Sequence, residues 1–246
     1  MQALIIAAGR GSRLWERTLQ SPKTLLPFLD GTILSQIMTN LTAAGASRFR
    51  LVIGFRGLDI VHYLRDHDLA ARVSCVENVE WHRGNALSVL RGGEAWVAAG
   101  DSMLLSMCDH LVTPDAVRLV ITHPSPKNLL LVDRRLEAVY DLEDATKVLV
   151  DGKHIIAIGK ELAEYNAVDC GIFRINVRML AAIRANIELN RESISEAASV
   201  LIDQDDFEAV DLPAAGAWID IDTPAAYRHA LDHAKLLTYR LVSGRP

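Results

Sequence analysis

The sequence lacks long hydrophobic runs, an excess of basic residues and a rich supply of cysteine. No stretch approaches the roughly 18 uninterrupted apolar residues that a transmembrane helix needs, so we expect no membrane span. The N-terminus has no basic region and only a short apolar run, which argues against a signal peptide. The 26 lysines and arginines are outnumbered by 31 acidic residues, and the net charge of -5 argues against non-specific nucleic-acid binding.

Cysteine is scarce and is not arranged for metal binding. Cys75, Cys108 and Cys170 are widely spaced and odd in number, without the spacing of zinc ligands, which is typical of a reducing compartment. The sequence also has no linker rich in proline, glycine or serine, no internal repeat and no low-complexity tract. We therefore expect a cytoplasmic protein whose residues 1–246 form a single domain with a large core.

Apolar strands and amphipathic helices alternate through the first half of the chain. In order, we expect a strand at 1–8, a helix capped by Thr32, a strand at 50–54, a helix at 58–65, a strand at 73–76, a helix capped by Asn85, a strand at 102–107 and a helix capped by Thr113. The Asn85 helix should bury Trp96 and Val97. This alternation predicts a parallel sheet with helices on both faces.

The second half adds strands typical of antiparallel pairing. They are expected at 129–133, 147–150, 155–158, 172–175, 207–212 and 218–221, with helices at 177–187, at 193–202 and after Thr223. Asp151-Gly152, between two of these strands, is a hairpin signal. The whole pattern predicts an α/β fold: a doubly wound, mostly parallel, Rossmann-like sheet with helices on both faces and an antiparallel extension.

A glycine-rich loop directly follows the first strand, in residues 9–14. Glycines let a backbone approach an anion closely, and their N–H groups can bind it. The loop is not a P-loop, because the string G-x-x-x-x-G-K-[ST] does not occur. A dinucleotide-binding loop would have a third glycine where Leu14 stands and an acidic residue after the next strand, which ends in Gly54-Phe55-Arg56. A phosphate site is the favoured interpretation, with the dinucleotide site as an alternative.

Carboxylates follow two other strands. Asp109 comes just after the strand at 102–107, at the edge where ligands bind in open α/β sheets. Asp220 and Asp222 alternate along a strand and should point to the same face. Together the three would form an oxygen site suited to Mg²⁺ and substrate phosphates. The alternatives are that Asp109 is an ordinary loop or capping residue and that Asp222 only caps the last helix.

Two segments carry a resemblance to a known family. Ala7-Ala8-Gly9-Arg10-Gly11-Ser12-Arg13-Leu14 and Pro22-Lys23-Thr24-Leu25-Leu26-Pro27 resemble the signature of the nucleotidyltransferases that join an NTP to a sugar phosphate or alcohol phosphate. The resemblance extends from Gln2 to about Tyr227 and includes Asp109, Asp220 and Asp222 as metal ligands. It implies that the nucleotide is bound by Ala8, Gly9, Gly11, Arg13, Lys23 and the base-reading segment Gly84-Asn85-Ala86.

The same resemblance implies an acceptor side. Lys160 matches a lysine that meets the acceptor phosphate, and Asn166, Asp169 and Gly171 lie in a segment resembling the family's acceptor-binding segment. Arg13, Lys23 and Lys160 would then be the catalytic residues, because nucleotidyl transfer needs positive charge on crowded anions.

Each of these assignments has an ordinary structural alternative. Lys23 can be a solvated lysine, Gly84-Asn85-Ala86 a plain helix start, and Asp169 a turn residue. The basic residues Arg10, Arg13 and Arg17 can form a solvated face. By their spacing, His82, His110, His154 and Cys170 form no ligand cluster, so we interpret them as structural or peripheral.

Within the family, two segments look most similar to CTP:inositol-1-phosphate cytidylyltransferases: residues 159–173 and Cys108-Asp109-His110. That resemblance implies CTP and inositol-1-phosphate as substrates, CDP-inositol and pyrophosphate as products, and a role in inositol phosphodiester synthesis. Many such enzymes are fused to a membrane-embedded transferase, which we expect to lie outside this chain. The alternatives are mannose-1-phosphate guanylyltransferase, phosphocholine cytidylyltransferase and a non-catalytic nucleotide-sensing subunit. The oligomeric state is left open.

Overall fold

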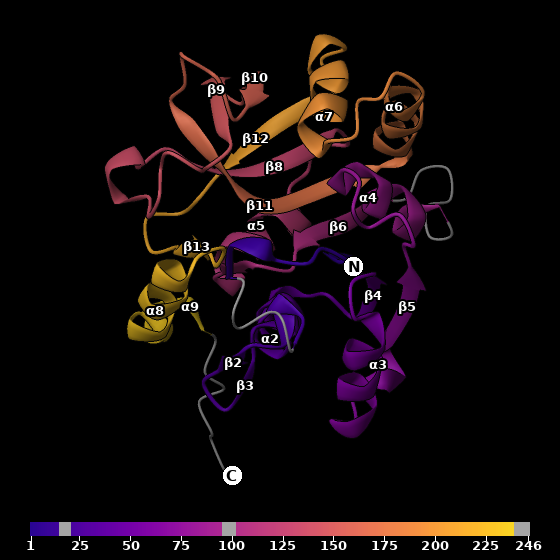
Figure 1. The fold of residues 1–246 in the computed structure, drawn as a ribbon. Helices are drawn as coiled ribbons and strands as arrows, with labels where there is room; N and C mark the ends of the chain where they lie inside the picture. Colours follow the sequence, from indigo (N-terminus) through magenta and orange to yellow (C-terminus); the bar gives the residue numbers. More distant parts are fainter. Residues whose placement is uncertain (15–20, 95–101, 239–246) are drawn as a thin grey trace.

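The computed structural model describes residues 1–14, 21–94 and 102–238. At the centre of the protein lies a nine-stranded sheet that takes strands from both halves of the sequence (Figure 1). In order across the sheet, the strands are β5 (Val73–Glu77), β4 (Arg48–Ile53), β1 (Gln2–Ala7), β6 (Ser102–Met107), β11 (Ala167–Asn176), β8 (Asn128–Asp133), β12 (Phe207–Asp211), β10 (His154–Gly159) and β9 (Lys147–Asp151).

The sheet is mostly parallel, as predicted. β5, β4, β1 and β6 are mutually parallel, and β8 is parallel to β12. β11 lies between β6 and β8 and is antiparallel to both, whereas the β9–β10 hairpin extends the far edge. The expected fold class is therefore confirmed, with antiparallel pairing in the middle of the sheet as well as at its end.

The expected strand at 172–175 is only the second part of β11. The register between β11 and β8 shifts between Asp169 and Phe173, and Gly171 within this shift has a φ of +76°. A bulge of this kind interrupts the alternation of side chains along a strand. Because of this interruption, the periodicity of the sequence predicted only the second part of β11.

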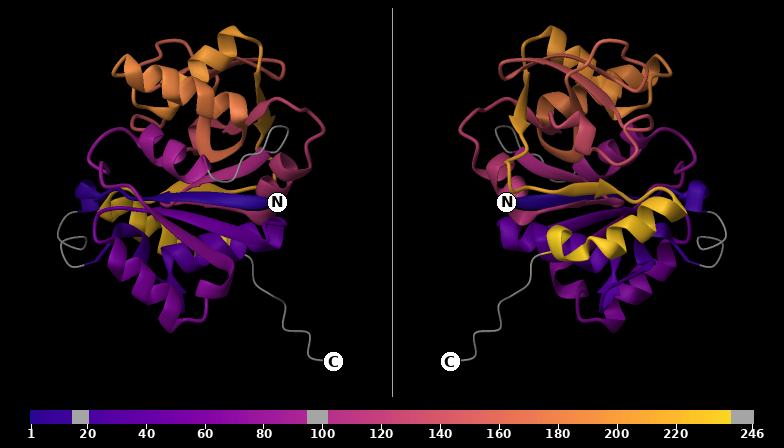
Figure 2. Two further views of the ribbon diagram at one scale, coloured as in Figure 1. Left: turned by 90° about the vertical axis from the view of Figure 1, so that its right-hand side faces the viewer. Right: turned by 90° about the vertical axis from the view of Figure 1, so that its left-hand side faces the viewer.

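Helices cover both faces of the sheet (Figure 2). One apolar cluster lies under α2 (Ile33–Ala44), α3 (Gly57–Asp66), α5 (Pro114–Thr122), α8 (Pro224–Asp232) and α9 (Ala234–Leu237). The second lies under α4 (Asn85–Gly93), α6 (Val177–Glu188) and α7 (Ile194–Asp203). Within the described ranges, no helix has both the length and the apolar character needed to cross a bilayer.

The starts of the helices agree with several predicted caps and correct two. The Thr32 hydroxyl accepts from Ser35 N at 3.2 Å at the start of α2, as expected. Thr223 caps α8 by accepting from Ala226 N, so Asp222 is not the cap of that helix. Asn85 is the first residue of α4 rather than its cap, because Gly84 holds the cap position. The expected burial of Trp96 and Val97 falls outside the described residues.

A second, two-stranded sheet connects the two halves of the chain near the end of β6. It pairs β7 (His110–Val112) with β13 (Trp218–Asp220), so that Asp220 lies opposite His110. Ile221 N then donates to Asp109 O at 2.9 Å. This pairing carries the carboxylates of residues 220 and 222 to the carboxyl end of β6, where Asp109 lies.

Candidate active site

The glycine loop after β1 wraps around a lysine. Gly11 has a φ of +63°, a conformation that glycine adopts at little cost. A Cβ at Gly11 would lie 2.8 Å from Lys23 Cβ, so the absence of a side chain lets the loop close over the lysine. A Cβ at Gly9 would meet no atom of the described residues within 4 Å, so none of them fills the space beside this backbone.

Lys23 is buried and belongs to an ion-pair cluster. Its Nζ atom donates to Asp109 Oδ2 at 2.6 Å and to Asp222 Oδ1. Burial opposes the charge on Lys23, but the Asp109 and Asp222 carboxylates hold its pKa above the usual value. The alternative of a solvated lysine is therefore wrong.

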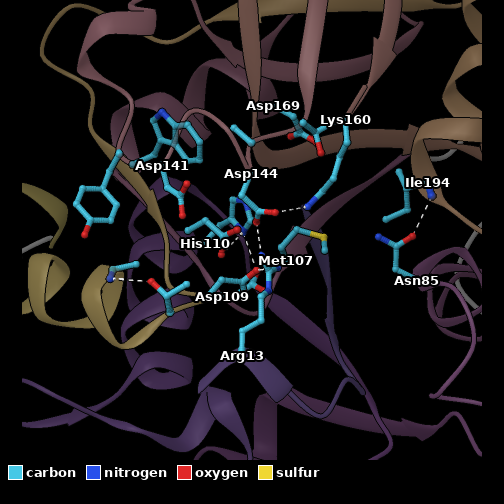
Figure 3. Close-up of a pocket in the computed structure, with 18 of the residues that line it drawn as sticks. Arg13, Asn85, Met107, Asp109, His110, Asp141, Asp144, Lys160, Asp169 and Ile194 are labelled. Atoms are coloured by element: carbon cyan, nitrogen blue, oxygen red, sulfur yellow. Dashed lines mark hydrogen bonds and ion pairs between the residues drawn. The ribbon is translucent and has the colours of Figure 1, made fainter. Parts of the chain in front are cut away.

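Arg13 connects this cluster to a carboxylate that the sequence did not single out. Its guanidinium donates to Asp222 and to Asp144, which lies in the segment between β8 and β9. Residues from the beginning, middle and end of the chain thus meet at Arg13 (Figure 3). Arg13 therefore belongs to the ion-pair cluster, and its side chain, which is 48% exposed, also faces solvent.

His110 also belongs to this cluster, so of the two roles expected for it, structural or peripheral, the peripheral one is wrong. Nδ1 lies 2.7 Å from Asp109 Oδ1 and 3.8 Å from Asp220 Oδ1, and the ring stacks on Trp218. Burial disfavours the charged ring, but the carboxylates of Asp220 and Asp109 raise the pKa of His110 to about 9. Its position directly after Asp109 was the only sequence signal for this role.

Asp220 has one buried carboxylate oxygen without a hydrogen-bond partner among the described residues. This oxygen is Oδ1, and burial together with the Asp109 and Asp222 charges raises the pKa of Asp220. Asp220 lies close enough to share a cation with Asp109 and His110, or with Asp222 and Asp144. Oxygen-rich ligand sets of this kind suit Mg²⁺. The residues present therefore fit a divalent cation.

One pocket lies along the glycine loop. It is lined by Ala8, Gly9, Gly11, Lys23, Gly84 and Asn85, with Arg13, Asp109 and Asp222 at one end. Seven of the eight residues predicted for nucleotide binding thus surround a single pocket. Ala86 is buried beneath it, and its N–H donates to Glu192 O at 2.9 Å.

The segment at the start of α4 is clamped to the turn between α6 and α7. The Glu192 carboxylate accepts from Gly84 N at 3.1 Å and from Arg83 Nε at 2.9 Å. Asn85 Oδ1 accepts from Ile194 N at 2.9 Å, to one side of the carboxylate cluster (Figure 3). Sequence reasoning did not find this clamp, because its partners are far apart in the chain.

A second pocket opens on the other side of the carboxylates. It is lined by Lys160, Asp169, Asp144, His110, Trp218 and Tyr140, among others. Lys160 Nζ donates to Asp144 Oδ1 at 2.9 Å. Burial raises the pKa of Asp169 to about 6, while Gly171 N donates to its Oδ1 at 2.6 Å.

Two residues predicted for the acceptor do not line this pocket. The Asn166 side chain accepts from Val150 N at 2.9 Å and donates to Val150 O at 2.8 Å, so its amide bridges to β9. Gly171 packs against His110, where an added Cβ would lie 2.4 Å from Cδ2. Asn166 and Gly171 therefore contact residues around the pocket without lining it themselves.

The two pockets share a boundary. Arg13, Asp109 and Asp222 line both of them, as do Asn85 and Met107. Two binding spaces with cationic side chains therefore meet over a cluster of carboxylates, which is an arrangement suited to transfer between two anionic substrates.

Comparison with known proteins agrees with this geometry. A family model described as a MobA-like NTP transferase domain matches residues 3–158. The bifunctional IPC transferase and DIPP synthase of Rubrobacter xylanophilus is 31% identical over 92% of this chain and 50% of its own length. The protein of the same name from Aquifex aeolicus is 28% identical over 90% of this chain and 49% of its own length. The chain thus spans about half the length of these relatives.

Solved structures share the fold over nearly the whole chain. The inositol-1-phosphate CTP transferase from T. maritima has a TM-score of 0.82 and 28% identity, covering 96% of this chain and 95% of its own. A putative glucose-1-phosphate thymidylyltransferase from Bacillus anthracis has a TM-score of 0.81 and 18% identity, covering 98% and 97%. The second similarity concerns the fold alone.

Proposed function

The chain belongs to the family of MobA-like NTP transferase domains, and on that premise we propose that it is a cytidylyltransferase acting on inositol-1-phosphate. It would transfer CMP from CTP to this acceptor and release CDP-inositol and pyrophosphate. The similarity to the inositol-1-phosphate CTP transferase from T. maritima supports both substrates, at 28% identity over nearly the full length of both chains. The dinucleotide interpretation of the glycine loop is set aside by the family match.

The observation that carries the proposal is the shared boundary of the two pockets. The pocket along the glycine loop has Lys23 and Arg13 for a triphosphate, and the pocket beyond the carboxylates has Lys160 for an acceptor phosphate. A phosphate monoester is already ionised at neutral pH, so its oxygen can attack the α-phosphorus without a protein nucleophile. A bond forms from this oxygen to the α-phosphorus, and the bond to the pyrophosphate oxygen breaks.

In this scheme the protein binds and orients the two substrates and neutralises the charge of their phosphates. Lys23 and Arg13 would compensate the charge of the triphosphate, while Lys160 would hold the acceptor phosphate. Asp169 lines the acceptor pocket, where it could accept hydrogen bonds from acceptor hydroxyls. The proposed base-reading residues are Gly84 and Asn85, which line the nucleotide pocket.

Mg²⁺ is the proposed metal, and Asp109, Asp220 and Asp222 would hold it. When bound, it would supply positive charge to the phosphates at the boundary of the pockets. The orphaned oxygen of Asp220 supports this assignment. A membrane-embedded transferase as partner, a role in phospholipid biosynthesis and a cytoplasmic location stay predictions.

The proposal is tested by pyrophosphate release in a matrix of substrates with Mg²⁺. CTP, GTP, UTP and dTTP would each be combined with inositol-1-phosphate, hexose-1-phosphates and phosphocholine. We expect the highest kcat/KM for CTP with inositol-1-phosphate. If kcat/KM is instead highest for GTP with mannose-1-phosphate, both the base and the acceptor are wrongly assigned. If it is highest for CTP with phosphocholine, the acceptor is wrongly assigned. Nucleotide binding without any turnover would indicate the sensing subunit.

A further inference from the structure

Asp144 occupies a special position in the ion-pair cluster. One oxygen of its carboxylate, Oδ1, accepts from Lys160 Nζ at 2.9 Å, and the other, Oδ2, accepts from Arg13 (Figure 3). Within the described parts of the chain, it is the one carboxylate that contacts both of these basic residues. Lys160 lines only the acceptor pocket, whereas Arg13 also lines the nucleotide pocket.

The backbone around Asp144 is held independently of its side chain. Asp169 N donates to Thr146 O at 2.9 Å, which ties the segment to β11. Ala145 N donates to Asp141 O at 3.3 Å and closes a turn around Asp144. The main chain therefore fixes the position of the Asp144 carboxylate. The long side chains of Lys160 and Arg13 can be oriented by binding to it.

Lysine and arginine side chains lose considerable rotamer freedom when they are ordered. The Lys160 side chain is 52% exposed, so its ammonium group would sample many positions without a partner. Binding to Asp144 uses one of the three donors of Lys160 and leaves the others for a phosphate. Arg13 has five donors, so it can contact Asp144 and Asp222 and still offer others to a phosphate.

We propose that Asp144 is a positioning residue that aligns Lys160 with Arg13, and hence the acceptor phosphate with the α-phosphate. This inference rests on the proposed function, because it assigns Lys160 to the acceptor. Asp144, which lines the acceptor pocket, acts through the two basic residues that it contacts. Correct alignment of two reactants contributes much to catalysis in such transfers. The reactants then lose their translational and rotational entropy on binding, and not in the transition state.

The experiment compares Asp144→Asn with Glu143→Gln. Both variants remove one negative charge from the same segment, but Glu143 is exposed and lines neither pocket. With CTP and inositol-1-phosphate, Asp144→Asn should lower kcat/KM for the acceptor by about tenfold or more, the size of a lost charge-assisted contact. Glu143→Gln should stay within about twofold, and the melting temperatures of both variants should stay close to that of the wild type.

A double-mutant cycle tests whether Asp144 acts through Lys160. In a Lys160→Ala background, Asp144→Asn should change kcat/KM for the acceptor by less than about twofold. If the two losses multiply instead, Asp144 acts elsewhere and the assignment is overturned. A decrease in the acceptor KM of Asp144→Asn would also overturn it, because Asp144 would then compete with the phosphate. Wild-type protein without transferase activity would refute the proposed function and this assignment together.

Discussion

At the scale of single residues, the site is a chain of alternating charges. Lys160 contacts Asp144, Asp144 contacts Arg13, and Arg13 contacts Asp222, which in turn contacts Lys23. Each carboxylate is thus balanced by a basic side chain that is also proposed to bind a phosphate. Substrate phosphates and a divalent cation can therefore enter together. The phosphates would bind donors of the basic residues while Lys160 and Arg13 keep their contacts with Asp144, and the cation would bind Asp109, Asp220 and Asp222.

Asp109→Asn tests the metal assignment. The amide keeps the size of the side chain and can still accept from Lys23, so the fold should be retained. Turnover should fall by more than about 100-fold, because a metal ion supplies several kcal/mol of charge stabilisation in such reactions. Pyrophosphate release across a Mg²⁺ titration measures the effect, with circular dichroism as the check on folding and Asp115→Asn on α5 as the exposed control. Near wild-type activity at low Mg²⁺ would exclude Asp109 as a ligand.

Gly9→Ala tests whether phosphates approach the glycine loop. The added methyl group meets no atom within 4 Å in the described part of the chain, so the melting temperature should not change. CTP affinity should fall, since the methyl group would fill space next to the phosphates. Calorimetric titration of CTP checks this prediction, and unchanged affinity would place the triphosphate elsewhere.

Gly11→Ala provides the contrast. Its φ of +63° and the 2.8 Å approach to Lys23 Cβ predict a loss of stability of about 1–3 kcal/mol. A substitution at Gly11 thus acts through the protein itself as well as through any ligand. Thermal unfolding of Gly9→Ala and Gly11→Ala side by side separates the two effects, and equal melting temperatures would contradict the description of the loop.

At the scale of elements, the sequence predicted the strands, helices and turns that local patterns specify. It did not predict the contacts between residues far apart in the chain. Hydrophobic periodicity and caps located β1, β6, α2 and the β9–β10 hairpin. Asn85 looked like a cap because asparagine favours that position, yet its amide binds Ile194 N, 109 residues away. His110 has Asp109 as a partner beside it in the sequence, but its other partner, Asp220, reaches it only through the β7–β13 pairing.

The clamp between α4 and the α6–α7 turn gives a prediction at this scale. A Cβ at Gly84 would lie 2.1 Å from the backbone oxygen of Glu192, so Gly84→Ala must push the two elements apart. We expect a loss of about 1–3 kcal/mol in the free energy of unfolding, as overpacking usually causes, and weaker CTP binding. Gly159→Ala is the matched control, since its nearest contact would be 3.9 Å away. Chemical denaturation measures both variants, and equal stability would contradict the clamp.

At the scale of the whole molecule, the sheet order explains why a site predicted from scattered residues is compact. β1 and β6 are adjacent and parallel, so the loops that follow them meet at the same edge. The glycine loop and Asp109 were predictable for this reason, together with the fold class. Asp144 was not, because it lies in a segment without regular structure whose position is set by backbone contacts with β11. The single-domain interpretation stays a prediction.

The central claim is that two pockets divide the substrates, with Lys23 serving the NTP and Lys160 the acceptor. Titration of CTP into Lys23→Ala and Lys160→Ala, in the absence of acceptor, tests it most directly. A lost charge-assisted phosphate contact costs about 1.5–3 kcal/mol, so Lys23→Ala should weaken CTP binding by roughly 10- to 150-fold. Lys160→Ala should leave CTP affinity nearly unchanged and should instead raise the KM for the phosphorylated acceptor or lower kcat. If Lys160→Ala weakens CTP binding as much as Lys23→Ala does, both lysines serve one phosphate site and the division between the pockets is wrong.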